Sequence, residues 1–135
     1  MKMESDIKVR GIRAEDAEEW LRLRCDLWPD GKNDHEEEIA MYFAGQLKEP
    51  LAVIVAESPG KIVAIAELSI REDLSGYTGQ KVGYVEGLYL EPESRGGSIA
   101  VRLLRAARNW AHENQCVAFA SDRAERIIVD PLYRK

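Results

Sequence analysis

The spacing of apolar residues changes along the chain, and each change predicts an element of the fold. Residues 7–12 alternate apolar and polar side chains, which is typical of a half-buried strand. From Ala14 to Trp28 the apolar residues follow a helical period, and Pro29-Asp30-Gly31 ends that helix. Asp34 then caps a predicted second helix. The apolar side of this second helix contains Ile39, Ala40, Phe43 and Leu47.

Short apolar runs separated by turn residues predict five further strands and one further helix. The helix joins the fourth and fifth strands, and a crossover of that length requires these two strands to be parallel. We therefore expect one α/β (α+β) domain over residues 1–135, with a mixed, mostly antiparallel sheet flanked by helices. The strands are predicted at 51–56, 62–70, 81–90, 116–120 and 127–129, and the helix at 98–114.

Composition excludes several classes of protein. A net charge of −5 disfavours nucleic acid as a partner, because phosphate binding needs a basic face. No apolar run approaches the ~20 residues that span a bilayer, and residues 1–6 lack the apolar core of a signal peptide, so we expect a cytoplasmic protein without membrane contact. Two cysteines and two histidines predict neither a disulfide frame nor a metal site. Acidic residues between Asp26 and Glu38 indicate either a solvated helix start or a rim that attracts cations.

A Gly-rich turn, Arg95-Gly96-Gly97-Ser98, separates the fourth strand from its helix. Free amides at the helix start suit a pyrophosphate, and glycines let the backbone approach it, although an ordinary tight turn has the same pattern. In context the turn resembles the acetyl-CoA motif of GNAT N-acetyltransferases, Arg/Gln-x-x-Gly-x-Gly/Ala. Ser98 replaces a glycine of that motif, and Gly97 stands where the family often has an arginine, so we expect weakened CoA binding. The resemblance assigns Arg95, Gly96, Gly97, Ser98, Ile99, Ala100 and Val101 to the cofactor.

Within that superfamily the chain resembles the aminoglycoside 6'-N-acetyltransferases of antibiotic resistance, from Ile7 to about Asp122. Four segments carry the resemblance in one order: 20–29, 66–71, 85–92 and 119–122. The resemblance implies acetyl-CoA as co-substrate and a small cationic amine as acceptor. It fails after Asp122, where the family has a helix and closing strands but only residues 123–135 remain here. We therefore expect an internal deletion that removes the C-terminal helix.

Two carboxylates are candidates for catalysis and substrate binding. Amide formation from acetyl-CoA needs a neutral amine, an oriented thioester and a donor for the developing oxyanion. Glu86 lies in an otherwise apolar strand, where a carboxylate is costly unless its face is wet, it has a partner, or it has a function. The resemblance places the antibiotic-binding glutamate at Glu86, which would hold the ammonium and accept its proton through water. Asp122 resembles the acceptor-binding aspartate, but with Glu125 it also fits a capping box.

Other site residues depend more heavily on the resemblance. Trp28 matches the aromatic wall of the acceptor pocket, although core packing explains it equally well. Glu67 is a lesser substrate-binding candidate, and solvation is the simpler reading of it. The resemblance assigns the amides of Leu88 and Leu90 to the pantetheine arm and the thioester oxygen. The tyrosine acid of many relatives lies on the missing helix, and Tyr89 and Tyr133 are placeholders for it.

The first hypothesis is therefore an acetyl-CoA-dependent aminoglycoside 6'-N-acetyltransferase. An acetyltransferase for a polyamine or another small amine, and an inactive module for binding or oligomerisation, are the alternatives. Without the last helix, we expect the apolar residues 116–120 to be uncovered. The segment 127–132 then either folds back as an antiparallel partner of the fifth strand or pairs with a second chain. Because an exposed strand edge favours pairing, we expect a homodimer whose interface includes this strand and the uncovered face.

Overall fold

A computed structural model describes residues 6–123 and 126–132. Its six strands form one sheet in which their spatial order equals their chain order. β4 and β5 are parallel and the other neighbours are antiparallel, which confirms the predicted topology. The strands are β1 Lys8–Gly11, β2 Ala52–Ser58, β3 Lys61–Arg71, β4 Val82–Leu90, β5 Ala118–Arg123 and β6 Arg126–Pro131, and the helices are α1 Ala17–Leu27, α2 Lys32–Phe43 and α3 Ile99–Glu113.

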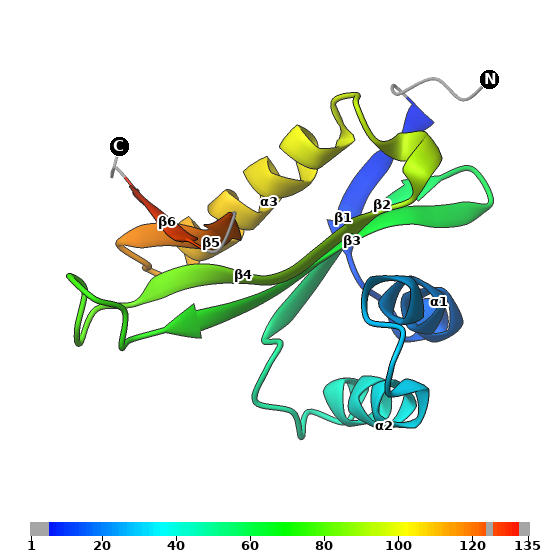
Figure 1. Ribbon diagram of the computed structural model, residues 1–135, viewed down its shortest axis with the longest axis horizontal. Coiled ribbons are helices and arrows are strands. Elements are labelled where there is room, and N and C mark those ends of the chain that lie inside the picture. Colours follow the sequence, from blue (N-terminus) through cyan, green and yellow to red (C-terminus); the bar gives the residue numbers. More distant parts are fainter. Residues whose placement is uncertain (1–5, 124–125, 133–135) are drawn as a thin grey trace.

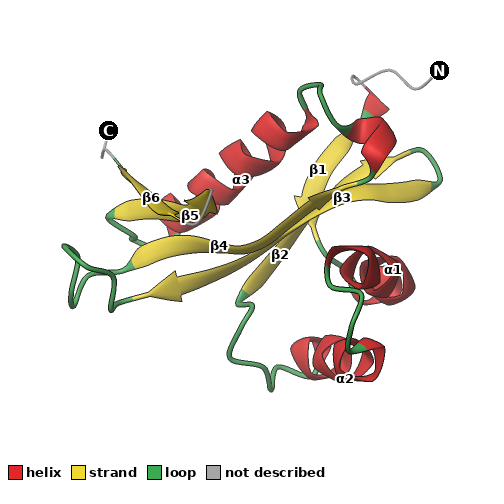
Figure 2. Cartoon of the chain, in the orientation of Figure 1, coloured by secondary structure: helices red, strands yellow, loops and turns green. Residues whose placement is uncertain are grey.

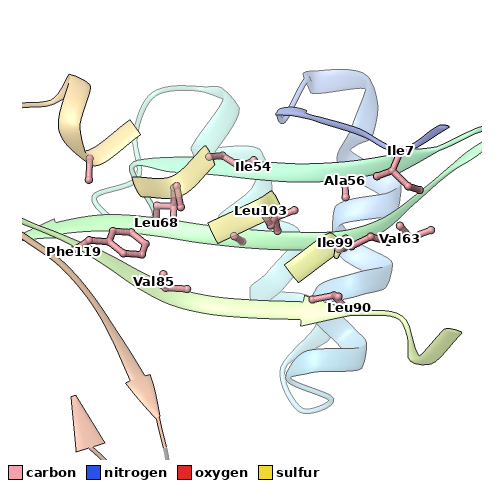
Figure 3. Close-up of a cluster of buried hydrophobic side chains, with 14 of the residues drawn as sticks. Ile7, Ile54, Ala56, Val63, Leu68, Val85, Leu90, Ile99, Leu103 and Phe119 are labelled. Carbon is pink, nitrogen blue, oxygen red and sulfur yellow. The ribbon is translucent and has the colours of Figure 1, made fainter. Parts of the chain in front are cut away.

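Helices cover the two faces of the sheet unequally. α3 packs on one face, and α1 and α2 lie on the other (Figure 1). Alternate residues of β3 supply both cores, because neighbouring side chains of a strand point to opposite faces. On the α3 side, Leu68 packs with Leu103 and Phe119 (Figure 3). On the α1 side, Ile65 packs with Trp20 and Leu23. Successive residues of β3 therefore belong to two separate hydrophobic cores, one on each face of the sheet.

The α1 face over β4 and β5 is covered by a loop rather than a helix. The segment between β3 and β4 lies at that end of the sheet (Figure 2). Its Leu74 and Tyr77 pack against Tyr84 and Ala120. Together with α3 on the opposite face, this loop buries Ala118, Phe119 and Ala120 within one chain. The expectation that residues 116–120 are uncovered is therefore wrong.

The chain after β5 folds back on itself. β6 pairs antiparallel with β5 after residues 124 and 125, too few for a helical crossover. This confirms the antiparallel alternative for the last strand. Among the described residues, no helix is long and apolar enough to cross a membrane.

The start of α2 differs from the prediction. α2 begins at Lys32 and its N-cap is Gly31, whose φ of +92° favours glycine. Asp34 therefore lies in the first helical turn, where its charge suits the helix dipole, rather than at the cap. Leu47 lies beyond the end of this helix.

Candidate active site

β4 and β5 diverge at the centre of the sheet. Their parallel pairing ends at Val85 and Ser121, while β4 continues to Leu90. A cavity of about 350 Å³ opens where they part. It is lined by Val85, Glu86, Gly87, Leu88, Leu104, Ser121 and Asp122. The cavity therefore joins the two candidate carboxylates to the α3 side of the sheet.

Beyond Val85, β4 has no strand partner among the described residues on the side of this gap. Glu91 donates its N–H to the carbonyl of Val63 in β3, at 2.9 Å. Backbone groups alternate in direction along a strand, so Leu88 and Leu90 face away from β3, towards the gap. The Leu90 carbonyl indeed accepts a hydrogen bond from Nε of Arg95, at 2.9 Å. The amides assigned to the pantetheine arm thus point into the gap between β4 and β5.

The Gly-rich turn has the predicted strand–turn–helix geometry. Gly96 has a φ of +86°, and the position of its missing Cβ is open space. The first amides of α3, after Ser98, have no acceptor within the helix, as at every helix start. Arg95 is held away from the helix start, because it binds the Leu90 carbonyl and lies 5.5 Å from the ring of Tyr89. The turn therefore offers backbone groups more than side chains to an anion.

A β-bulge places Glu86 on the α1 face. Glu67 pairs with Gly87 and Leu68 with Val85, so Glu86 is the extra residue of the ladder. Its Oε1 accepts from Nη2 of Arg71 at 2.8 Å, and its Oε2 accepts from Nε of Arg71 at 3.0 Å. Ser69 donates a further hydrogen bond to Oε2. A bidentate arginine pair explains how this strand tolerates a carboxylate.

Arg71 links Glu86 to the second carboxylate. Its guanidinium carbon lies 3.8 Å from the ring centre of Tyr84. Tyr84 donates its hydroxyl to Asp122 at 2.5 Å. Burial and this hydrogen bond raise the pKa of Tyr84 to about 12. Asp122 itself lies inside β5, so it does not begin a helical turn as the capping alternative required.

The remaining sequence candidates occupy different environments. Trp28 is 37% exposed at the end of α1, with its ring against the backbone of Gly87. Glu67 is 2% exposed, so the expectation that it is solvated is wrong. Its carboxylate accepts from Arg24 at 2.7 and 3.0 Å and from Nε1 of Trp20 at 2.9 Å. Of the two placeholder acids, Tyr89 donates to Asp26 at 3.3 Å, and Tyr133 lies outside the described residues.

Sequence reasoning missed the partners of the acidic residues. Ser69, Arg71 and Tyr84 complete the network between Glu86 and Asp122, and Arg24 neutralises Glu67. The sequence signal for these partners is the two-residue spacing of Glu67, Ser69 and Arg71. In a strand, this spacing places three polar side chains on one face of β3. The residues that they contact follow from strand register and helix packing.

A split between parallel β4 and β5, with a glycine turn and a helix start beside it, is typical of a site for a phosphate-bearing ligand. The family model described as "Acetyltransferase (GNAT) family" matches residues 17–135. The chain therefore belongs to the GNAT acetyltransferase family.

Within this family, the chain is similar to several aminoglycoside acetyltransferases. An aminoglycoside N(6')-acetyltransferase type 1 of Klebsiella aerogenes is 39% identical over 122 residues, which are 89% of this chain and 80% of that protein. A protein of the same name from Acinetobacter haemolyticus is 35% identical, over 86% of this chain and 79% of its own. The solved structure of AAC(6')-Ih from Acinetobacter baumannii is 31% identical, with a TM-score of 0.75 over 87% of this chain and 80% of its own. AAC(6')-Iy in complex with the bisubstrate analog CoA-S-monomethyl-acetylneamine is 27% identical, with a TM-score of 0.77 and the same coverage.

Proposed function

We propose that the protein transfers an acetyl group from acetyl-CoA to the 6'-amine of an aminoglycoside. The observation that carries this proposal is the similarity to aminoglycoside N(6')-acetyltransferases over nearly the whole chain. The acidic residues Glu86 and Asp122 support it, because they line the cavity where β4 and β5 part. Two carboxylates there attract a polycationic acceptor, although Glu86 shares its charge with Arg71.

The observed gap and turn fit acetyl-CoA. Leu88 and Leu90 would hold the pantetheine arm and thioester oxygen through outward amides, and residues 95–101 would hold the pyrophosphate at the start of α3. Glycine leaves room for that approach at Gly96, where a Cβ would meet nothing within 4 Å. Acetyl-CoA supplies an activated acetyl thioester to the site.

The acceptor would lie on the α1 face, between an aromatic wall and the two carboxylates. Trp28 supplies the wall, and Glu86 binds the ammonium and accepts its proton through a water. Because both oxygens of Glu86 already accept hydrogen bonds from Arg71 or Ser69, the ammonium competes with Arg71 for this carboxylate. Asp122 holds a second amine. Glu67 contributes indirectly, since its oxygens are buried and engaged by Arg24 and Trp20.

Thiol release from acetyl-CoA tests the function directly. Release with kanamycin, and not with spermine or without acceptor, is the expected result. Release with spermine alone would reassign the acceptor to polyamines. No release with any acceptor, from protein that binds CoA, would indicate an inactive module and overturn the proposal.

We also propose that the enzyme is a homodimer. β6 is an edge strand of the sheet, and its Ile127 is 48% exposed. An apolar side chain on an open strand edge favours pairing with a second copy. Burial of residues 116–120 within one chain removes the other reason for expecting a dimer, so the proposal depends on β6.

A further inference from the structure

Gly87 provides the space in which the ring of Trp28 lies. A Cβ built on Gly87 would lie 2.7 Å from Cη2 and 3.1 Å from Cζ2 of Trp28, and 3.3 Å from Leu27. Carbon atoms that are not bonded pack at about 3.5–4.0 Å, so any side chain at this position displaces the indole. Gly87 has no positive φ, so the backbone does not require glycine here. The requirement is for space alone.

A buried cation supports Trp28 from within the protein. The guanidinium carbon of Arg24 lies 5.4 Å from the ring centre of Trp28 and 5.8 Å from that of Trp20. Arg24 is held in place by both oxygens of buried Glu67 and by Glu38, at 2.7 Å. A guanidinium with a bidentate partner is fixed in orientation as well as in charge.

His35 of α2 fastens the backbone of Trp28. Its Nε2 lies 2.8 Å from the Trp28 carbonyl, and its Nδ1 lies 3.3 Å from Nη1 of Arg24. Because arginine only donates, Nδ1 is the acceptor and Nε2–H donates to the carbonyl. The two imidazole nitrogens therefore connect Arg24 to the residue whose ring it supports. The imidazole and indole centres are 6.3 Å apart.

The bulge in β4 brings this aromatic ring beside the candidate substrate carboxylate. Glu86 and Gly87 are consecutive, and both face α1 because Glu86 has no partner in the ladder. Trp28 is 37% exposed, and its ring packs on Gly87, the residue that follows the carboxylate that would receive the ammonium. An amino sugar has an apolar C–H face beside its ammonium, which suits an indole wall next to an anion.

We propose that Gly87, Arg24 and His35 are positioning residues that hold Trp28 as the wall of the acceptor pocket and thereby determine affinity for an amino-sugar acceptor. This inference rests on the proposed function. Gly87 acts by leaving space, and Arg24 and His35 act by fixing the indole and its backbone. The amides assigned to the pantetheine arm point along the sheet into the gap, whereas Gly87, Arg24 and His35 act on Trp28 at the α1 face, so we expect the affinity for CoA to be independent of these three residues.

Gly87→Ala tests the inference, with Gly11→Ala as the matched control. Gly11 is also a strand glycine, and a Cβ there meets nothing within 4 Å. We expect Gly87→Ala to raise the KM for kanamycin on the order of tenfold, while the KM for acetyl-CoA stays unchanged. Gly11→Ala should change neither. A general loss of folded protein would lower the apparent kcat and leave both KM values unchanged. A rise in the KM for kanamycin alone therefore identifies positioning.

His35→Leu and His35→Gln test the second support without touching the sheet. Glutamine can still donate to the Trp28 carbonyl and accept from Arg24, whereas leucine can do neither. His35→Leu should raise the KM for kanamycin and His35→Gln should restore it. An unchanged KM for kanamycin in Gly87→Ala, from an enzyme that acetylates kanamycin, would overturn the inference.

Near-ultraviolet circular dichroism separates this inference from the function on which it rests. Gly87→Ala should move the tryptophan signal towards that of Trp28→Phe, whether or not kanamycin is acetylated. A parent that acetylates no aminoglycoside would reject the proposed function. An unchanged tryptophan signal in Gly87→Ala would instead reject the placement of Trp28 on Gly87.

Discussion

The Glu86 carboxylate is stabilised in β4 by Arg71, and an acceptor ammonium must bind the same carboxylate oxygens. Arg71 binds both of its oxygens, and Arg71 also lies against Tyr84, which donates to Asp122. The acceptor site is therefore a network of one arginine, two carboxylates and a neutral tyrosine rather than a bare acidic pocket. A bound ammonium gains less from Glu86 than from an unpaired carboxylate, but it enters a site that is already ordered.

Glu86→Gln should lower kcat/KM for an aminoglycoside while CoA affinity stays unchanged. Loss of one charge beside a bound ammonium in a partly buried site costs on the order of 1–3 kcal/mol, roughly a five- to 150-fold loss. Steady-state kinetics and calorimetric CoA titration measure the two effects. Glu57→Gln is the control, because Glu57 is another strand glutamate paired with an arginine, Arg10 at 3.1 Å. Equal losses in both variants would contradict a substrate role for Glu86.

Tyr84 predicts a loss of stability at alkaline pH. Its pKa is about 12 in the protein, against about 10 in an unfolded chain. Between these values the unfolded state gives up the proton first, so the free energy of unfolding falls as pH rises from about 10 to about 12. Asp122→Asn should lower the Tyr84 pKa only partly, because burial, the larger cause, persists. Tyrosinate absorbance, with Tyr84→Phe to assign the signal, measures this. An unchanged titration in Asp122→Asn would contradict the contact.

The sequence and the family resemblance together predict part of this site. Glu86 stood out as a charge in an apolar run, and Trp28 and Asp122 were named by resemblance to a family. The partners could not be named in this way, because Arg24 and Glu67 are 43 positions apart and Tyr84 and Asp122 are 38 apart. Glu67 was read as solvated for the same reason. A buried carboxylate is credible only once its cation is known.

At the scale of elements, the periodicity of the sequence predicted the three α-helices and six strands that the structure describes, with boundaries shifted by a few residues. Strand alternation and helical period depend on local residues, so they are visible in sequence. The bulge at Glu86 is not, because it is a mismatch between β3 and β4. That one extra residue turns both Glu86 and Gly87 towards α1, and the acceptor face depends on it.

The turn before α3 predicts a gain of function in cofactor binding. Gly97 has no positive φ, so its backbone accepts an arginine, and a charge there would meet the pyrophosphate. Gly97→Arg should bind CoA about three- to tenfold tighter. Gly96→Arg is the contrasting variant, since the φ of +86° strains any side chain there, and it should bind more weakly. Calorimetry measures both, and equal weakening in both would argue against a phosphate site at this turn.

At the scale of the whole molecule, the described chain after β5 adds an antiparallel strand to the sheet rather than a helix on its face. β6 covers the far edge of β5, while α3 and the loop before β4 cover the faces of β5. The expectation of an uncovered β5 failed because it considered only what the missing helix would have covered. Here the loop before β4 covers a face of β5 that a helix after β5 could also have covered. The order of elements in the sequence does not reveal which segment covers that face.

The open edge of β6 carries the last prediction, a homodimer. Leu132 donates its N–H to Val117, so by alternation the amides of Val129 and Ile127 point away from β5 and are available to another strand. Pro131 has the same outward orientation and lacks an N–H, which confines pairing to the residues before it. Light scattering at micromolar concentration should give twice the 15.3 kDa of one chain.

Ile127→Lys should convert that dimer to a monomer, because it places a charge on the paired edge. Leu51→Lys is the matched control: Leu51 is 50% exposed, close to the 48% of Ile127, but lies before β2. Dissociation by Ile127→Lys alone assigns the interface to β6. Dissociation by both variants would place the interface elsewhere, and a parent of 15.3 kDa would overturn the dimer.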